Sequence, residues 1–250
     1  MNRILPIVVT VALIFAVGLS GFLAFKHFTK PAVQMGDDET EDVLKELPLE
    51  EKPYTTLVPG PSCEYTLNMS GIKNSPESVE YEIVYKNEEG VTQGASGTIK
   101  PTSGTSTKKL LFGTESSGHR RCDKGVSGGT ITVRYRNDDG KLIAKMETPF
   151  TIAEDDTMID LKGGLSVSGL PAKGKHLAMG TFGLPEKAPG KVNSGPFGVF
   201  SNTKTLSGTP KIEGTGDLYA TGFLYGYDGS EWMKVSGKTS ALEALILVSQ

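Results

Sequence analysis

Residues 129–147, GTITVRYRNDDGKLIAKME, decide the fold class, because apolar and polar residues alternate on both sides of a turn. On the first arm, three apolar residues alternate with three polar ones: Ile131, Val133 and Tyr135 against Thr132, Arg134 and Arg136. This period of two is that of a strand with one buried face. Residues 137–140 are Asn, Asp, Asp and Gly, which tolerate positive φ, and residues 141–146 return. The stretch is therefore predicted to form an antiparallel β-hairpin.

The same alternation recurs throughout residues 54–152. In VEYEIVYKNEEG (79–90), the residues predicted to share one face are Val79, Tyr81, Ile83 and Tyr85. CEYTLNMSGI (63–72) and TKKLLFGT (107–114) supply further strands. About six or seven short strands separated by Gly, Asn and Ser turns predict an all-β fold, with an immunoglobulin-like β-sandwich over 54–152.

In this pattern, residues 54–152 resemble immunoglobulin-like and fibronectin-III-like extracytoplasmic domains. The resemblance implies a two-sheet architecture and no particular ligand. The segment departs from true immunoglobulin domains in two respects. No Trp lies between Cys63 and Cys122, and Cys122 is not part of a Tyr-x-Cys strand.

A second β-module is expected over 153–250. AEDDT (153–157) marks a boundary, and glycine becomes frequent after it. Because the 31 glycines of the chain lie between short β-like runs, they are interpreted as turns. The terminal run 241–248 is apolar, and it either completes its own sheet or adds to the edge of another subunit.

An aromatic hairpin is predicted within 216–237, GDLYATGFLYGYDGSEWMKVSG, with Asp-Gly at 228–229 as its turn. Residues 218–250 resemble an aromatic Asp-Gly hairpin element of phage and virion structural proteins, which implies an assembly module without chemistry. The candidate partner-binding residues are Tyr225, Tyr227, Trp232 and Lys234. Two alternatives stay open: the aromatic rings could stack on a ligand or glycan, or they could pack as the hairpin's own core.

The N-terminal segment 1–30 is predicted to be a transmembrane anchor. Residues 4–25, ILPIVVTVALIFAVGLSGFLAF, carry no charge, and at about 1.5 Å per residue they span a hydrocarbon core of about 30 Å. The alternative is a cleaved signal peptide, for which Gly18-Leu19-Ser20 offers small residues. The charges that flank the segment nearly balance, so the orientation stays open. We expect a single-pass membrane protein whose bulk is extracytoplasmic or on a virion surface.

Residues 31–53 are expected to form an acidic linker. The stretch GDDETEDVLKELPLEEKP (36–53) is rich in carboxylates, and its few apolar residues could form only one weak helical turn. Repulsion between its charges would extend it as a solvated spacer between the membrane and the β-modules.

Cys63 and Cys122 are the only cysteines, and in an exported protein two cysteines most simply form one disulfide. The alternative is two free thiols in a reducing compartment. The net charge is −3, which argues against nucleic acid as a partner, since a phosphate-binding face needs an excess of Lys and Arg. No metal or cofactor site is expected, because two cysteines are too few ligands for zinc.

No catalytic constellation is recognised. None of the histidines (His27, His119 and His176) lies in a metal-binding or nucleophile motif. Residues 119–124, HRRCDK, are interpreted as a solvated loop beside the disulfide, with a small anion-binding patch as the alternative. We therefore expect a non-catalytic structural or interaction protein with a protein partner or self-association. The alternatives are a ligand- or glycan-binding surface module and an unrecognised secreted hydrolase.

Overall fold

The computed structural model describes residues 44, 46–101, 104–222 and 231–249. The predicted anchor at 4–25 and the two tyrosines Tyr225 and Tyr227 lie outside this part of the chain. In the described ranges, no helix combines the length and the apolar character that crossing a membrane would require. The described structure is all-β with large antiparallel sheets, as predicted, and its one helical element is the 3-10 turn η1 (Leu49–Glu51).

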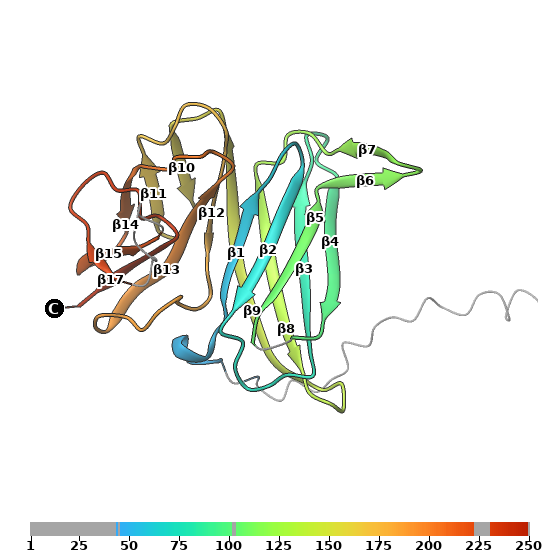
Figure 1. Ribbon diagram of the computed structural model, residues 1–250, viewed down its shortest axis with the longest axis horizontal. Helices are drawn as coiled ribbons and strands as arrows, with labels where there is room; N and C mark the ends of the chain where they lie inside the picture. The colour runs from blue at the N-terminus through green and yellow to red at the C-terminus, as the bar shows by residue number, and fades with distance from the viewer. Residues whose placement is uncertain (1–43, 45, 102–103, 223–230, 250) are drawn as a thin grey trace, which may run out of the picture. The chain divides into compact units, whose positions relative to one another are not determined.

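The largest sheet has nine strands in the order β16-β15-β17-β13-β12-β9-β8-β3-β4, all antiparallel (Figure 1). Its strands, in chain order, are β3 (Ser78–Lys86), β4 (Thr92–Ile99), β8 (Gly128–Arg136), β9 (Leu142–Glu154), β12 (Lys175–Gly180), β13 (Val192–Ser201), β15 (Asp217–Thr221), β16 (Met233–Lys234) and β17 (Ala244–Val248).

The predicted hairpin at 129–147 is confirmed as the turn between β8 and β9. Asn137 N–H donates to Lys141 O at 3.1 Å, and Gly140 has φ 76°. The three apolar residues expected to face the core are fully buried: Ile131, Val133 and Tyr135. The pattern therefore identified the correct face of the strand.

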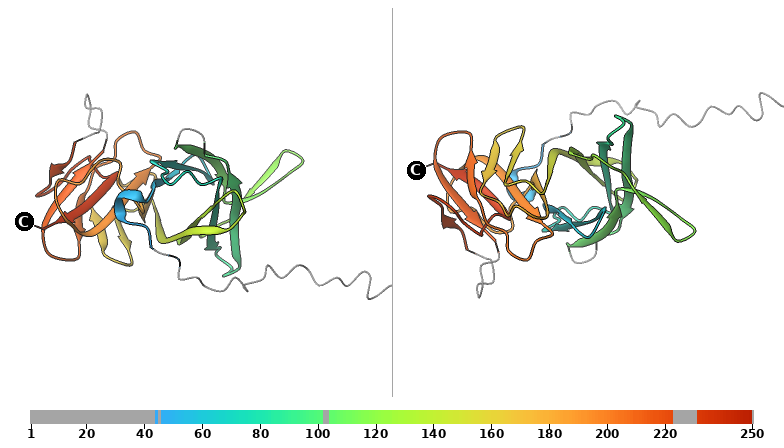
Figure 2. Two further views of the ribbon diagram at one scale, coloured as in Figure 1. Left: turned by 90° about the horizontal axis from the view of Figure 1, so that it is seen from below. Right: turned by 90° about the horizontal axis from the view of Figure 1, so that it is seen from above.

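A three-stranded sheet packs against β9-β8-β3-β4 and closes the first hydrophobic core. Its order is β1-β2-β5, with bounds β1 (Tyr54–Pro59), β2 (Glu64–Ser70) and β5 (Ser106–Leu111). The two sheets contribute alternate side chains, so Leu57 and Leu67 from one meet Ile83 and Ile131 from the other in one buried cluster. Figure 2 shows these strands end-on as two layers.

The second core lies between β12, β13, β15 and β17 and a separate three-stranded sheet. That sheet has the order β10-β11-β14, with bounds β10 (Met158–Leu161), β11 (Leu165–Ser168) and β14 (Thr209–Ile212). Val167 and Ile212 from this sheet pack with Ala178 and Leu245 from the large one.

Three neighbouring strands, β9, β12 and β13, contribute side chains to both cores. β9 is 13 residues long; its first part pairs with β8, and residues 150–154 pair with β12. The acidic segment 153–157 begins within this strand, and the chain turns at Asp155, which has φ 53°. The large sheet is therefore continuous across the expected module boundary.

The C-terminal apolar run completes its own sheet. β17 is buried at all five positions and lies between β13 and β15. The two arms of the second predicted hairpin pair where the structure describes them: Tyr219 lies opposite Lys234, and Ala220 lies opposite Met233.

The end of the expected linker packs on the β-fold. Pro53 is buried, Lys73 Nζ donates to Glu50 O at 2.6 Å, and Asn74 Nδ2 donates to Glu51 Oε2 at 3.1 Å. Residues 49–53 therefore differ from the solvated spacer that the charge pattern predicted, because their backbone and carboxylates find partners in the turn after β2.

Candidate interaction site at the disulfide

Cys63 and Cys122 form a disulfide, as predicted, with a Cα–Cα distance of 5.6 Å. Cys63 immediately precedes β2, and Cys122 ends the short strand β7 (His119–Cys122). The bond therefore joins the start of one core strand to a segment 59 residues further along the chain. It fastens that segment to the sandwich.

An aromatic stack lies beneath the disulfide. The ring of Phe112 stacks on Tyr65 at 4.0 Å and on Tyr85 at 4.3 Å between centroids. Tyr85 Oη donates to Asp123 Oδ2 at 2.9 Å, one residue beyond Cys122. Burial, together with this hydrogen bond, raises the pKa of Tyr85, so the phenol stays protonated as the donor.

A β-hairpin leaves the sandwich directly after Phe112. It consists of β6 (Gly113–Ser116) and β7, and it projects away from the strands around it in Figure 1 and in both views of Figure 2. Its turn places Ser117 at φ 51° and Gly118 at φ 78°, the two positive values of a two-residue hairpin turn. Beyond Gly113, every residue of both strands is exposed.

The base of this hairpin is fixed by backbone geometry and by charge. Gly113 has φ 152°, and a Cβ there would overlap Arg121 O, so the close pairing of the two strands needs glycine. Arg120 forms ion pairs with Glu115, at 2.7 Å, and with Glu64 of β2. The disulfide and the Arg120–Glu64 pair thus join the hairpin to two adjacent residues, Cys63 and Glu64, where β2 begins.

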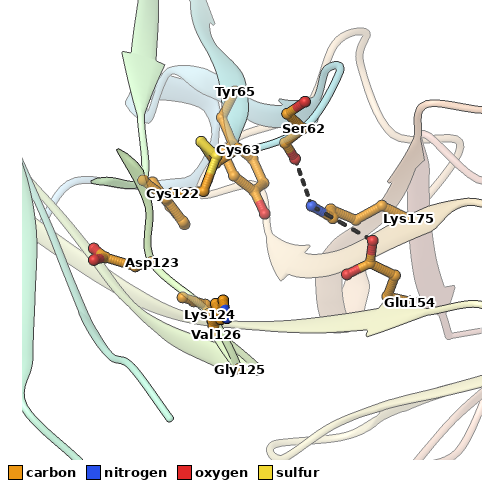
Figure 3. Close-up of a pocket in the computed structure, with 11 residues that line it drawn as sticks. Ser62, Cys63, Tyr65, Cys122, Asp123, Lys124, Gly125, Val126, Glu154 and Lys175 are labelled. Atoms are coloured by element: carbon orange, nitrogen blue, oxygen red, sulfur yellow. Dashed lines mark hydrogen bonds and ion pairs between the residues drawn. A yellow bond between two sulfur atoms is a disulfide. The ribbon is translucent and has the colours of Figure 1, made fainter. Parts of the chain in front are cut away.

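A pocket of about 290 Å³ opens beside the disulfide (Figure 3). Lys175, the first residue of β12, reaches into it with a side chain that is only 13% exposed. Its Nζ donates to Ser62 O at 2.7 Å, lies 3.9 Å from Glu154 Oε1, and lies 5.7 Å from the centre of the Tyr65 ring. Asp123 and Lys124 line another part of the wall.

The charges of this pocket are largely engaged in holding the fold. Lys175 ties β12 to the Ser62 turn and to Glu154 of β9, and Asp123 accepts from Tyr85. The volume is at the lower limit for small-molecule sites. This arrangement stabilises the base of the hairpin; it does not present a nucleophile beside a base.

His176 is fully buried and does not line the pocket beside the disulfide. Its Nε2–H donates to Pro171 O at 2.8 Å, and its Nδ1 lies 2.9 Å from Ser201 Oγ. The imidazole therefore joins β12, β13 and the preceding loop as an internal hydrogen-bonded group. His119 is far from this arrangement in the chain, on the exposed strand β7.

The residues expected to bind a partner are only partly described. Tyr225 and Tyr227 lie outside the described residues, while Trp232 is half-buried and Lys234 is exposed on β16. Lys234 Nζ donates to Asp217 Oδ2 at 2.6 Å, and this contact raises the pKa of Lys234. Their role in binding a partner stays a prediction.

Sequence reasoning missed the β6–β7 hairpin. It placed residues 107–114 in one strand and residues 119–124 in a loop, whereas β5 ends at Leu111 and β7 begins at His119. The available signal was Ser117-Gly118, a two-residue turn flanked by Glu115 and Arg120, whose opposite charges face each other across the strands.

Comparison with known protein families, curated proteins and solved structures finds no match to this chain. Within the described ranges, no group of three or more His, Cys, Asp or Glu side chains is arranged to hold a metal ion.

Proposed function

We propose that this chain is a membrane-anchored, non-catalytic interaction protein that displays its β-modules on an extracytoplasmic or virion surface and offers the β6–β7 hairpin to a protein partner. The observation that carries the proposal is the hairpin itself: it projects from the sandwich, and its base is fastened to the start of β2 by the Cys63–Cys122 disulfide and the Arg120–Glu64 ion pair.

A hairpin whose base is fixed in this way is suited to binding a protein partner. A binding element that is already ordered loses little conformational entropy when it meets its partner. A β-hairpin also exposes two strand edges, which can add to a partner's sheet. The disulfide supports an oxidising location, because disulfides persist outside the cytosol.

The strand order supports an immunoglobulin-like interpretation of residues 54–152. In immunoglobulin lettering, β1-β2-β5 correspond to A-B-E, and β4-β3-β8-β9 correspond to C′-C-F-G. The hairpin then occupies the connection between E and F. Immunoglobulin domains place their disulfide between strands B and F, whereas here it joins the start of B to the E–F connection.

The anchoring is tested on the full chain produced in a host that exports it. We expect the chain to resist extraction of membranes with alkaline carbonate, and we expect Cys63 and Cys122 to react with a maleimide only after reduction. A soluble chain whose two thiols react without reduction would contradict the proposal.

The role of the hairpin is tested by photo-crosslinking in the membranes that naturally contain the protein. A crosslinking residue at Ser117, in the tip of the hairpin, should give a protein adduct. The matched control is Asp139, which is exposed in the β8–β9 turn and should give none. Equal adducts at the two positions, or none at Ser117, would overturn the assignment.

A further inference from the structure

We propose that two copies of this chain associate through β4, edge to edge and antiparallel, with Ser96 of each copy on the two-fold axis. β4 is the last strand of the nine-stranded sheet and pairs only with β3 among the described residues. The inference rests on the geometry of this edge and does not depend on the membrane anchor or on the β6–β7 hairpin.

The unpaired N–H and C=O groups of an open sheet edge can pair with another chain. Proteins normally prevent this with lysine or proline in the edge strand, with a very short edge strand, or with another segment that covers the edge. Apart from the two short strands of the β6–β7 hairpin, the other edge strands of the described residues carry such devices. β5 exposes Lys108 and Lys109, β14 contains Pro210 and Lys211, and β16 is two residues long. β10 is four residues long and carries Asp160. β1 is covered, because Thr55 N–H donates to Thr181 O at 2.9 Å.

Among the described residues, β4 shows none of these devices. Its eight residues, TQGASGTI, include no charge and no proline, and its register with β3 runs from one end to the other without a bulge. Its four middle residues, 94–97, are Gly, Ala, Ser and Gly, so another backbone can approach closely there. Two of the four exposed large apolar side chains of the described residues lie beside it: Val84, opposite Gly94, and Val91, just before the strand.

The hydrogen-bond alternation shows which groups of β4 face outward. Asn87 N–H donates to Val91 O across the turn, which makes that pair a hydrogen-bonded one. In an antiparallel ladder, hydrogen-bonded pairs alternate with pairs whose N–H and C=O groups point away from each other. Counting along the unbroken register, Gly94, Ser96 and Thr98 direct their N–H and C=O groups toward the open edge.

These outward groups are self-complementary. When β4 meets a second β4 with Ser96 opposite Ser96, Gly94 lies opposite Thr98 in both halves, and every outward N–H faces a carbonyl. Ala95 then lies opposite Gly97, Gln93 opposite Ile99 and Thr92 opposite Lys100, so no two charged side chains face each other. A second copy of the same chain is therefore the partner whose chemistry this edge fits.

Cysteine crosslinking of the full chain in detergent micelles or native membranes tests both the contact and its register. Since Cys63 and Cys122 are joined, an introduced cysteine supplies the free thiol. In Ser96→Cys, the two new Cα atoms would be about 5.5 Å apart, as in a hydrogen-bonded pair, which a disulfide can span. In Thr98→Cys they would be about 14 Å apart along the strands, beyond its reach.

We expect a disulfide-linked dimer from Ser96→Cys under mild oxidation and at least tenfold less from Thr98→Cys. Equal crosslinking at the two positions, or no dimer from Ser96→Cys, would overturn the proposal. A second measurement is the sedimentation of Ser96→Pro, which loses the central outward N–H without losing a bond to β3. It should stay monomeric at concentrations where wild type and Ser96→Ala dimerise; dimerisation of Ser96→Pro would also overturn the proposal.

Discussion

Asp155 and Gly174 close a reciprocal pair of hydrogen bonds at the point where β9 ends. Asp155 N–H donates to Gly174 O at 2.9 Å, and Gly174 N–H donates to Asp155 Oδ1 at 2.9 Å. The pair holds the turn after β9 to the residue before β12, so it secures two neighbouring strands that contribute to both cores.

The Asp155 carboxylate should make stability depend on pH. The backbone N–H of Gly174 lowers its pKa below the ordinary value of 3.8, with Lys173 as a smaller cause. Because the pKa of Asp155 is lower in the folded state than in the unfolded state, the carboxylate stabilises the fold fully at pH values above its unfolded-state pKa. This stabilisation is lost as the pH falls through its folded-state pKa. Thermal unfolding should therefore show a Tm that falls more steeply below pH 4 in wild type than in Asp155→Asn.

The matched variants separate charge from hydrogen bonding. Asp155→Asn keeps the Oδ1 acceptor and tolerates the positive φ of this position, whereas Asp155→Ala loses the acceptor. At neutral pH, Asp155→Ala should have the lowest Tm of the three proteins. An Asn variant with the same acid sensitivity as wild type would show that other carboxylates are responsible.

Removal of the disulfide should destabilise the sandwich strongly. Closing a loop of 59 residues restricts the unfolded chain, and the double variant Cys63→Ser/Cys122→Ser should lose about 4 kcal/mol of unfolding free energy. Denaturant titration of the full chain measures the loss. Reduced wild type serves as the control and should match the variant; a loss below about 1 kcal/mol would show that the unfolded chain is already restricted.

Phe112 should be the most sensitive residue of the aromatic stack. It is 1% exposed and contacts Tyr65, Tyr85 and Phe150. Phe112→Ala should cost about 3–5 kcal/mol through lost burial and a cavity. Phe112→Leu keeps most of the apolar volume and should cost roughly 1–2 kcal/mol, mainly the stacking. Equal losses in the two variants, measured by denaturant titration, would contradict a role for ring stacking.

Gly113→Ala should loosen the β6–β7 hairpin. The added Cβ would overlap Arg121 O, so the two strands would have to separate at their base. Gly118→Ala is the matched control: its φ of 78° also favours glycine, but nothing lies within 4 Å of the added atom. The control should cost about 1 kcal/mol in strain alone. Limited proteolysis should cut the hairpin faster in Gly113→Ala; equal rates in both variants would show that the clash is relieved without opening.

Local patterns in the sequence predicted the elements whose partners are close in the chain. The β8–β9 hairpin follows from the alternation around Ile131 and from the turn ending in Gly140, because both the side-chain period and the turn chemistry are local properties. The pairing of Cys63 with Cys122 followed from counting, since two cysteines allow only one intramolecular disulfide.

Relationships between distant residues were not predictable from such patterns. That Tyr85 donates to Asp123, that Lys175 reaches Ser62, and that β9 serves two cores all depend on how separate strands are ordered in the sheets. Strand order depends on how all the strands together bury the two cores. The sequence of a single segment therefore does not predict it.

The amino-acid sequence by itself determined the all-β class, the buried face of its clearest strands and the identity of the disulfide, because side-chain periodicity, turn residues and a count of two cysteines act locally. Only the tertiary structure decided which of the described strands lie at the edges, among them β4, and that the β6–β7 hairpin projects. The physical reason is that an edge is defined by the absence of a neighbour, which depends on where every other strand has packed.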